Sequence, residues 1–462
     1  MDHARAMTSA PALRLEQDGQ PLRRAAIFAV LASMALVVLD AGVANVALPT
    51  IARTLRVAPG AAILVVSAYQ TALVMALLPC GALGERFGYR RVFAGGAALF
   101  TLASALCALA PTLAWLAAAR FAQGLGGAAI MALGVALLRF SVPAGRFGAA
   151  IGWNALTVAL CAAAGPSLGA LILTGAGWPW LFAANLPLGA LVLVATRALP
   201  AGPRGVGGLD VVSAVLNAAM FGALVAGAEL APRTPAGAAA LLGVAAIALA
   251  ALIRREAPRR APLIPIDLLR IDAFRISVIA SVCCFAGQTA GLAALPFRLQ
   301  HGLGLTPLTT GLCMTAWPLS VAASAGVVAR VADRAPGAWL CAGGAGLLCV
   351  GLTGLALWPA TMGAPGMTGL MALCGLGFGL FQTPNNRAMF LSAPPERSGA
   401  AGALQGTARL TGQTAGAVIL TLLFATIGSE AAPRTAFGLG AVLALAASVV
   451  SALRAPRALT SP

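Results

Sequence analysis

Apolar runs alternate with short polar segments along the whole length of this sequence. Most runs are roughly 18 to 25 residues long and apolar on every side, and about 20 apolar residues suffice for a helix to cross a bilayer. A closed barrel would instead need shorter strands that alternate apolar with polar residues. We therefore predict an all-α polytopic membrane protein with fourteen transmembrane helices. The predicted spans are 25–50, 60–84, 91–110, 112–138, 147–174, 180–197, 210–231, 236–253, 275–296, 307–329, 337–358, 365–386, 401–428 and 434–453.

The longest internal polar segment, 254–274, is rich in Arg and Pro and divides these runs. Six runs precede 210–231, and six follow the polar segment. This order predicts two six-helix bundles with pseudo-two-fold symmetry plus two extra central spans. The predicted parts are a cytoplasmic N-terminal tail (1–24), an N-terminal six-helix bundle (25–200), the two extra spans (201–253), a cytoplasmic Arg/Pro-rich loop (254–274), a C-terminal six-helix bundle (275–453) and a cytoplasmic tail (454–462).

Composition indicates a chain surrounded by lipid rather than water. Hydrophobic residues make up 60% and charged residues 9% of the chain, whereas soluble domains carry about 25% charged residues. The net charge of +17 comes from arginines spread between the apolar runs, so nucleic-acid binding is not expected. With the N-terminus in the cytoplasm, 23 arginines fall on the cytoplasmic side and five on the other. That bias agrees with the positive-inside rule and predicts that both termini are cytoplasmic.

The sequence contains no motif that indicates a metal site or a cofactor site. The nine cysteines all fall in apolar runs, where they pack as small hydrophobic residues. There is no CxxC motif and no His/Cys cluster, so we expect neither a metal site nor a cofactor. About 24 mostly polar residues precede the first apolar run, which argues against a cleavable signal peptide.

Two short cytoplasmic loops each carry an acid followed by an arginine. One lies between spans two and three and the other between spans ten and eleven, which is the weak internal symmetry of transporters built from repeats. We predict that acid–Arg pairs in these loops form a conformational latch across the cytoplasmic mouth; the alternative is charge that only sets topology. The latch residues are Gly81, Glu85, Arg86, Gly88, Arg90 and Arg91 in the first loop, and Asp333 and Arg334 in the second.

Five motifs in order along the chain resemble signatures of the major facilitator superfamily, in its fourteen-span drug:proton antiporter branch. They are Leu39–Pro49 in span one, the Gly81–Arg91 loop, Arg120-Phe-Ala-Gln123-Gly124-Leu-Gly126 in span four, Gly165-Pro166-Ser-Leu-Gly169 in span five, and Trp178-Pro-Trp180 followed by Asn185-Leu-Pro187. The sequence departs from the usual patterns at Glu85, Tyr89, Cys161, Ala170 and Pro179.

This resemblance covers nearly the whole chain and implies two bundles around a central cavity that opens alternately to each side. It implies a multi-pass protein of the bacterial cytoplasmic (inner) membrane, working as a monomer. Gly165, Pro166 and Gly169 would belong to its antiporter motif.

Asp40 is the one acid that we place clearly inside a span. It lies about 15 residues, or roughly 22 Å, from the cytoplasmic start of span one, just past the middle of a core roughly 30 Å thick. Arg120 in span four reaches a similar depth, so we expect the two side chains to meet. An acid in the bilayer is costly and is by default functional. We predict that Asp40 carries a coupling proton and that Arg120 holds it when deprotonated; the alternative is a static ion pair.

Other polar residues within the spans are candidates for a substrate cavity. Span thirteen carries Gln405, Arg409 and Gln413 at a spacing that places them on one helix face. No acid lies in a span of the C-terminal half to neutralise Arg409, which favours a substrate with an acceptor or a negative charge. Polar bonds between helices are the alternative. The predicted cavity residues are Asn45, Gln70, Gln123, Asn154, Gln288, Gln382, Asn385, Gln405, Arg409 and Gln413.

These features favour a secondary exporter that moves small amphipathic organic molecules or drugs against protons. No P-loop indicates ATP use, and no catalytic motif or buried histidine indicates an enzyme. The expected partners are a small-molecule substrate, protons and the lipid bilayer. Export of a metabolite, sugar or organic anion, uncoupled facilitation, and a sensor without transport remain open alternatives.

Overall fold

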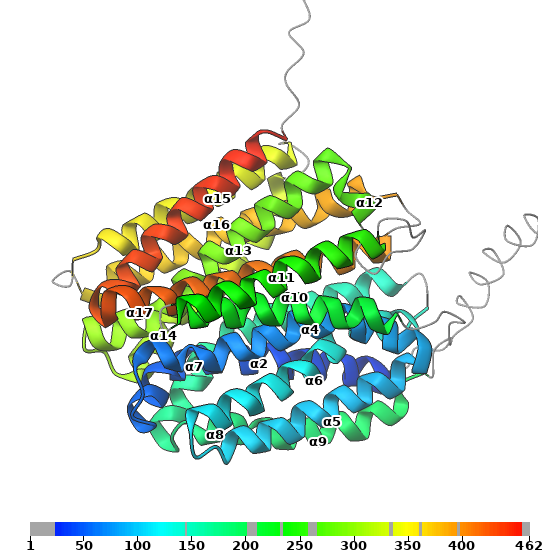
Figure 1. Cartoon of the computed structure of the whole chain (residues 1–462), viewed down its shortest axis with the longest axis horizontal. Coiled ribbons are helices and arrows are strands. Elements are labelled where there is room, and N and C mark those ends of the chain that lie inside the picture. The colour runs from blue at the N-terminus through cyan, green and yellow to red at the C-terminus, as the bar shows by residue number, and fades with distance from the viewer. Residues whose placement is uncertain are drawn as a thin grey trace, which may run out of the picture.

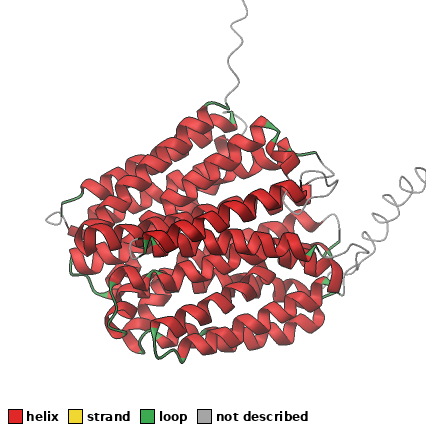
Figure 2. Ribbon diagram, in the orientation of Figure 1, coloured by secondary structure: helices red, strands yellow, loops and turns green. Residues whose placement is uncertain are grey.

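The computed structural model describes residues 24–143, 146–200, 210–231, 234–256, 266–331, 336–359, 363–394 and 398–454. Every regular element in these ranges is a helix, as Figure 2 shows. The all-α prediction is therefore confirmed for the described residues. Residues 1–23 of the N-terminal tail, residues 257–265 of the predicted 254–274 loop, Asp333 and Arg334, and residues 455–462 lie outside them.

Helices of the N-terminal half form a first group. It comprises α2 (Arg24–Thr54), α3 (Pro59–Ala62), α4 (Leu64–Phe87), α5 (Tyr89–Ala108), α6 (Leu113–Arg139), α7 (Phe147–Gly175), α8 (Pro179–Ala183) and α9 (Asn185–Ala195), which a short turn at Thr196–Ala198 extends. Contacts run from α4 and α5 to α6, and from α2 to α6, α7 and α9. Small residues allow this close approach: a Cβ atom on Gly124 of α6 would lie 2.4 Å from the carbonyl oxygen of Tyr69 on α4.

Helices of the C-terminal half form a second group. It comprises α12 (Ile266–Leu269), α13 (Asp272–Phe297) with a wider π turn at Arg298–Gly302, α14 (Pro307–Val331), α15 (Gly337–Leu357), α16 (Gly363–Ser392) and α17 (Ser398–Ala452). Gly428 interrupts α17 with a φ of 80°, so this element consists of two helical limbs. Both limbs belong to the group, in which α17 packs on α13 and α15, and α16 packs on α14 and α15.

A helical hairpin connects the two groups in sequence and lies against both. It consists of α10 (Val211–Leu230) and α11 (Pro235–Glu256), which pack on each other, and α10 contacts α4 of the first group and α17 of the second. Figure 1 shows the pair in green across the middle of the view. The Asn217 side chain of α10 donates a hydrogen bond of 3.0 Å to the carbonyl oxygen of Met75 on α4.

Twelve helical segments in the described part are long and apolar enough to cross a membrane. The sequence predicts fourteen, and the difference has two sources. The segment Leu404–Ala452 includes both limbs of α17, which correspond to the predicted spans 401–428 and 434–453, and α14 is not among the twelve. The fourteen-span count therefore remains a prediction, while a polytopic α-helical membrane protein is the observed architecture.

One contact between the two groups is that of α7 with α14, whose labels lie at the left of Figure 1. There the side-chain oxygen atoms of Ser167 on α7 and Thr315 on α14 are 2.6 Å apart. A Cβ atom on Gly311 of α14 would lie 2.4 Å from the carbonyl oxygen of Pro166 on α7. Gln300 also donates a hydrogen bond of 3.3 Å to the carbonyl oxygen of Val46 on α2. The groups are thus closed against each other at this end.

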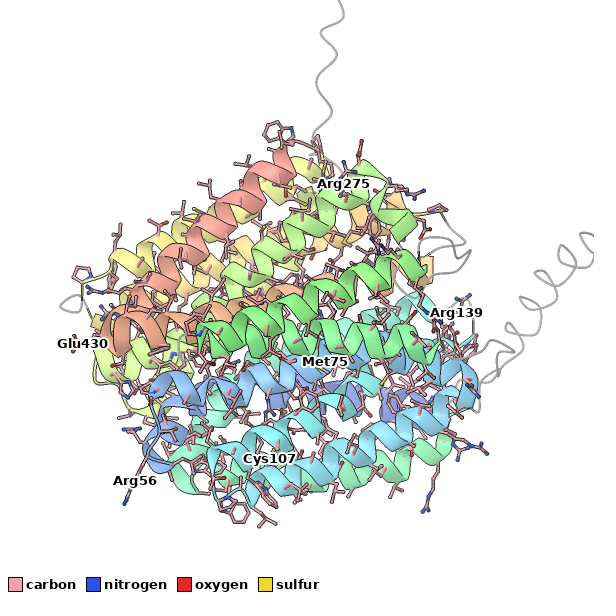
Figure 3. The ribbon with its side chains drawn as sticks, in the orientation of Figure 1. Arg56, Met75, Cys107, Arg139, Arg275 and Glu430 are labelled. Atoms are coloured by element: carbon pink, nitrogen blue, oxygen red, sulfur yellow. The ribbon has the colours of Figure 1, made fainter. Side chains whose placement is uncertain are left out.

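Labelled charged side chains lie toward the ends of the helices in Figure 3, with Arg56 and Glu430 at the left and Arg139 at the right. Met75 lies near the middle of the same view. This arrangement suits helices that cross an apolar layer, because ionised groups are expensive at its centre. Asp40, Arg120 and Arg409 lie within helices rather than at their ends, and the pair Asp40–Arg120 identifies the candidate site.

Candidate functional site

Asp40 lies in the interior of the first helix group, in the middle of α2. Only 3% of the residue is exposed. Its carboxylate receives charge-assisted hydrogen bonds from three side chains on two other helices: Arg120 Nη1 bonds to Oδ2, while Gln123 and Asn185 bond to Oδ1. The contact between Asp40 and Arg120 that the helical rise predicts is therefore present in the structure.

Two amide side chains hold one oxygen of the Asp40 carboxylate. Gln123 Nε2, from the turn of α6 after Arg120, donates at 2.9 Å, and Asn185 Nδ2, at the start of α9, donates at 2.7 Å. Gln123 Nε2 also donates at 2.9 Å to the hydroxyl of Ser104 on α5, which in turn donates to Phe100 O of its own helix. Four helices thus contribute to the surroundings of one carboxylate.

The Arg120 guanidinium is just as enclosed, with 1% of the residue exposed. Its Nε donates at 3.0 Å to the carbonyl oxygen of Val65 on α4, and its Nη1 donates to Gln123 Oε1 at 2.6 Å as well as to Asp40. The ring of Tyr69 lies 4.2 Å from its central carbon, which is close enough for a cation–π interaction. Hydrogen bonds and ring contacts together compensate for the loss of water around the charge.

Such an arrangement depends on the opposite charges of its two central side chains. A buried carboxylate with an adjacent guanidinium is stable when ionised, since the charges neutralise each other. Protonation of Asp40 would leave the Arg120 charge uncompensated in an apolar interior, which is unfavourable unless neighbouring helices move or water enters. The paired charges therefore stabilise the packing of α2 against α6.

Arg409 lies apart from this network, on the first limb of α17, and faces α4 of the first group. Its Nε is buried and has no hydrogen-bond partner among the described residues. On the same helix face, Gln405 donates to Asn386 of α16 at 3.2 Å, and Gln413 is half-buried.

The remaining predicted cavity residues lie in different surroundings. Gln123 belongs to the Asp40 network described above. Asn385 is fully buried and bonds to Ser281 at 2.9 Å, while Arg454 donates to its amide oxygen at 3.3 Å. The Asn45 side chain donates to Ala41 O of its own helix at 3.0 Å. The other predicted cavity residues are half-buried: Gln70, Asn154, Gln288 and Gln382. Their contact with a substrate stays a prediction.

The predicted latch residues of the first loop surround the turn between α4 and α5. Gly88 forms this turn with a φ of 95°, a conformation that favours glycine. Glu85, Arg86 and Arg91 are exposed, and within the described ranges no salt bridge involves Glu85. Gly81 and Arg90 are half-buried near the same turn. An engaged latch remains a prediction.

The predicted antiporter motif lies at a three-helix contact. A Cβ atom on Gly165 would lie 3.1 Å from Gly42 Cα, and one on Gly169 would lie 3.1 Å from Val43 Cα, so α7 packs directly on α2. The carbonyl oxygen of Pro166 contacts Gly311 on α14 of the other group. These small residues bring the segment of α2 that carries Asp40 close to the boundary between the groups.

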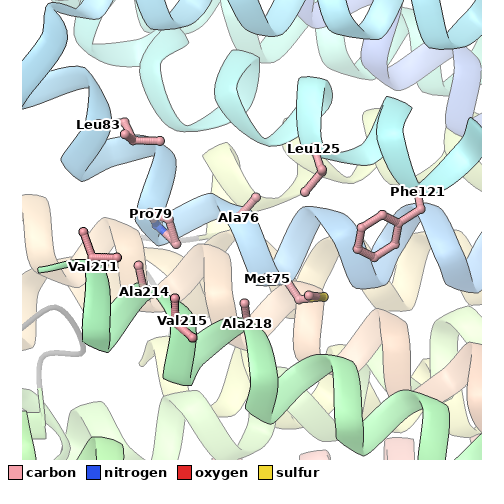
Figure 4. Close-up of a pocket in the computed structure, with 10 residues that line it drawn as sticks. All are labelled: Met75, Ala76, Pro79, Leu83, Phe121, Leu125, Val211, Ala214, Val215 and Ala218. Carbon is pink, nitrogen blue, oxygen red and sulfur yellow. The ribbon is translucent and has the colours of Figure 1, made fainter. Parts of the chain in front are cut away.

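An apolar groove of about 370 Å³ lies between α4, α6 and α10, as Figure 4 shows. Residues such as Met75, Phe121 and Val215 line it, and none of its lining side chains is charged. The lining suits a hydrocarbon chain and offers nothing to bind a proton or an ion. Within the described ranges, no cluster of His, Cys, Asp and Glu side chains could hold a metal ion.

Sequence reasoning did not assign Ser104, Asn185 or Tyr69 to the site. Asn185 stands in the Asn185-Leu-Pro187 motif, and that motif offered a signal, because an amide in an apolar run needs a partner. Ser104 and Tyr69 gave no comparable signal, since a small hydroxyl or a single tyrosine is ordinary in a membrane helix.

Comparison with known proteins identifies the family. The sequence model of the Major Facilitator Superfamily matches residues 30–417 and also 279–461, so the chain belongs to this superfamily. It is 41% identical over 96% of its length to an Escherichia coli (strain K12) protein named uncharacterized transporter YebQ, covering 98% of that protein. The members of this superfamily are transporters, and this chain is not an enzyme.

Further relatives include proteins named for drug export. The chain is 31% identical to the multidrug resistance protein Stp of Mycobacterium tuberculosis (strain CDC 1551 / Oshkosh), covering 83% of this chain and 73% of that protein. It is 30% identical to the tetracenomycin C resistance and export protein of Streptomyces glaucescens, with 87% and 76% covered. In fold it resembles a peptide transporter POT crystallised with sulfate, with a TM-score of 0.71, 18% identity and 94% of both chains covered.

Proposed function

We propose that this chain is a proton-coupled exporter of small amphipathic organic molecules across a bacterial inner membrane. The buried Asp40–Arg120 pair carries the proposal, because it is a proton-binding group within a span whose ionised form depends on one neighbouring cation. Relatives at about 30% identity that are named for drug or antibiotic export support the direction of transport.

The proposed mechanism is alternating access between two six-helix bundles. In the described conformation the groups are closed at one end, and with the termini in the cytoplasm this closed end faces outward. Protonation of Asp40 from the outside would weaken its bond to Arg120, and release of the proton inside would restore it. Fourteen spans, cytoplasmic termini, a monomeric state and latch closure by the acid–Arg loops belong to this proposal.

Transport in inverted membrane vesicles tests the proposal. Vesicles energised by a proton gradient would be loaded with a panel of fluorescent dyes, comparing wild type with Asp40→Asn. Wild-type accumulation that an uncoupler abolishes and that Asp40→Asn lacks is the expected result. The matched control is Asp272→Asn, because Asp272 is paired with Arg275 at 2.7 Å on the surface, with 78% of its side chain exposed. Equal gradient-driven transport by wild type and Asp40→Asn would overturn the assignment of Asp40.

A metabolite exporter or an uncoupled facilitator is the second candidate. The chain is 28% identical to a Clostridioides difficile (strain 630) protein named riboflavin transporter RibZ, covering 84% of this chain and 85% of that protein. A facilitator would give equal flux with and without the proton gradient in the same vesicles, and would leave Asp40 a structural role.

A further inference from the structure

Two buried donor groups on facing helices have no hydrogen-bond partner in the described structure: the hydroxyl of Tyr69 on α4 and the Nε of Arg409 on α17. Tyr69 is only 2% exposed. Most buried polar groups in proteins have partners, since burying an unpaired donor costs free energy. Two such groups facing each other across a boundary therefore call for an acceptor from outside the chain.

Packing between α4 and α17 places these two side chains together although they belong to different helix groups. A Cβ atom on Gly406 would lie 3.1 Å from Leu77 of α4, and Leu410 lies in the same buried cluster as Tyr69 and Leu73. Arg409 lies between Gly406 and Leu410 in sequence, and its charge acts on the Tyr69 phenol. The boundary between the groups thus has a cation on one side and a hydroxyl donor on the other.

The Tyr69 hydroxyl lies against a part of α6 where a glycine offers no side chain to bond it. A Cβ atom on Gly127 would lie 3.0 Å from the hydroxyl oxygen, so the hydroxyl lies over a helix position that has no side chain. Arg120 contacts the ring of Tyr69, and the hydroxyl at the far end of the side chain is buried without a partner among the described residues.

We propose that Tyr69 and Arg409 form a subsite for an anionic oxygen of the transported molecule, such as the carboxylate of an aromatic acid. This inference rests on the proposed transport function and specifies its substrate class. A guanidinium and a phenol both donate hydrogen bonds to a carboxylate, and charge-assisted bonds of this kind are stronger than neutral ones. A cationic substrate group would instead be repelled by Arg409, which has no salt-bridge partner among the described residues.

The subsite is joined to the proton site through a single side chain. Tyr69 contacts Arg120 through its ring, and Arg120 is bonded to Asp40. A ligand that shifts Tyr69 therefore changes the surroundings of the Arg120 cation, and movement of Arg120 after protonation of Asp40 changes the subsite in turn. This contact offers a physical route by which substrate and proton influence each other.

Binding to the full-length protein in detergent, without a proton gradient, tests the subsite. The probes are two pairs of equal shape: benzoate with benzamide, and 2-naphthoate with 2-naphthamide. We expect each carboxylate to raise the melting temperature at millimolar concentration more than its amide does. In Arg409→Gln and Tyr69→Phe we expect carboxylate affinity to fall about tenfold or more, the loss that follows from removing one charge-assisted hydrogen bond. Arg434→Gln, an exposed arginine on the second limb of α17, is the matched control and should bind as wild type does.

Three results would overturn the subsite: no stabilisation of wild type by either carboxylate, equal stabilisation by acid and amide, or unchanged carboxylate binding in both variants. Both variants should fold, because each loses a donor that has no partner. Since the assay uses no gradient, its failure differs from failure of the proposed function, which would be absence of gradient-driven transport in vesicles.

Discussion

Asn185 and Asp40 are 145 positions apart in the chain and are joined by a hydrogen bond of 2.7 Å. The bond links the start of α9 to the middle of α2, on the side of the carboxylate that Arg120 does not hold. An ionised Asp40 is therefore bound from two sides, by a cation and by amide donors. The site depends on the packing of α9 as well as on the α2–α6 pair.

Asn185→Ala tests this dependence. Hydrogen bonds to charged groups contribute about 1.5 to 3 kcal/mol, so we expect a clear fall in the melting temperature and slower gradient-driven transport. Asn45→Ala is the control for stability, because the hydrogen bond that the Asn45 amide donates among the described residues stays within its own helix, to Ala41 O at 3.0 Å. Equal stability of the two variants would contradict the role assigned to Asn185.

Arg120→Gln should destabilise the protein strongly. Removing one partner of a buried ion pair typically costs about 3 to 5 kcal/mol, because the other charge is left uncompensated. Thermal unfolding in detergent measures the loss, and Arg275→Gln, which breaks an exposed pair, should change stability by less than about 1 kcal/mol. The double variant Asp40→Asn with Arg120→Gln should regain part of the stability without regaining gradient-driven transport. A double variant as unstable as the sum of both single variants would show that the two side chains do not interact.

A disulfide between the helix groups should stop transport. Replacing Ser167 and Thr315 by cysteine puts two thiols where the hydroxyl oxygen atoms are 2.6 Å apart, on α7 and α14. Oxidation should lock this end closed and abolish transport, and a reductant should restore it. Each single-cysteine variant controls for the native cysteines. Full transport by the oxidised double variant, with the disulfide verified by mass spectrometry, would mean that the groups do not separate here.

Gly124→Ala should reduce stability through steric conflict alone. Its Cβ atom would lie 2.4 Å from the Tyr69 carbonyl oxygen and 2.7 Å from the Ala72 Cβ, so α4 and α6 would have to separate. Overpacking of this kind costs about 1 to 3 kcal/mol. Gly95→Ala is the control, since a Cβ atom there meets nothing within 4 Å. Similar melting temperatures for the two variants would indicate that α6 can shift without cost.

Long apolar runs were sufficient to predict the helices, because a membrane segment must satisfy its own backbone. Run lengths also placed the end of the predicted span 401–428 at Gly428, where the helical path of α17 is interrupted just before the polar residues Ser429 and Glu430. The helical rise per residue also predicted correctly that Asp40 and Arg120 lie at similar depths and meet, because this rise is constant. The number of residues from the end of a helix thus predicts well how deep in the membrane a side chain lies.

The sequence predicted poorly how each helix is rotated about its own axis. Spans that are apolar on all sides carry no periodic signal to show which face meets which neighbour. Gln123 illustrates this: it lies three positions from Arg120 and was expected in a cavity, but it bonds to Asp40 and Ser104 inside the first group. Ser104 could not be assigned for the same reason.

The α10–α11 hairpin makes the two edges of the intramolecular boundary unequal. Because α10 contacts both α4 and α17, the hairpin covers the boundary where these two helices meet, while α7 and α14 contact each other directly across the boundary. A molecule that entered the boundary sideways from the lipid would therefore have to part α7 from α14 or displace the hairpin. On the α7–α14 side the small residues that permit close packing, such as Gly311, would be the ones that have to separate.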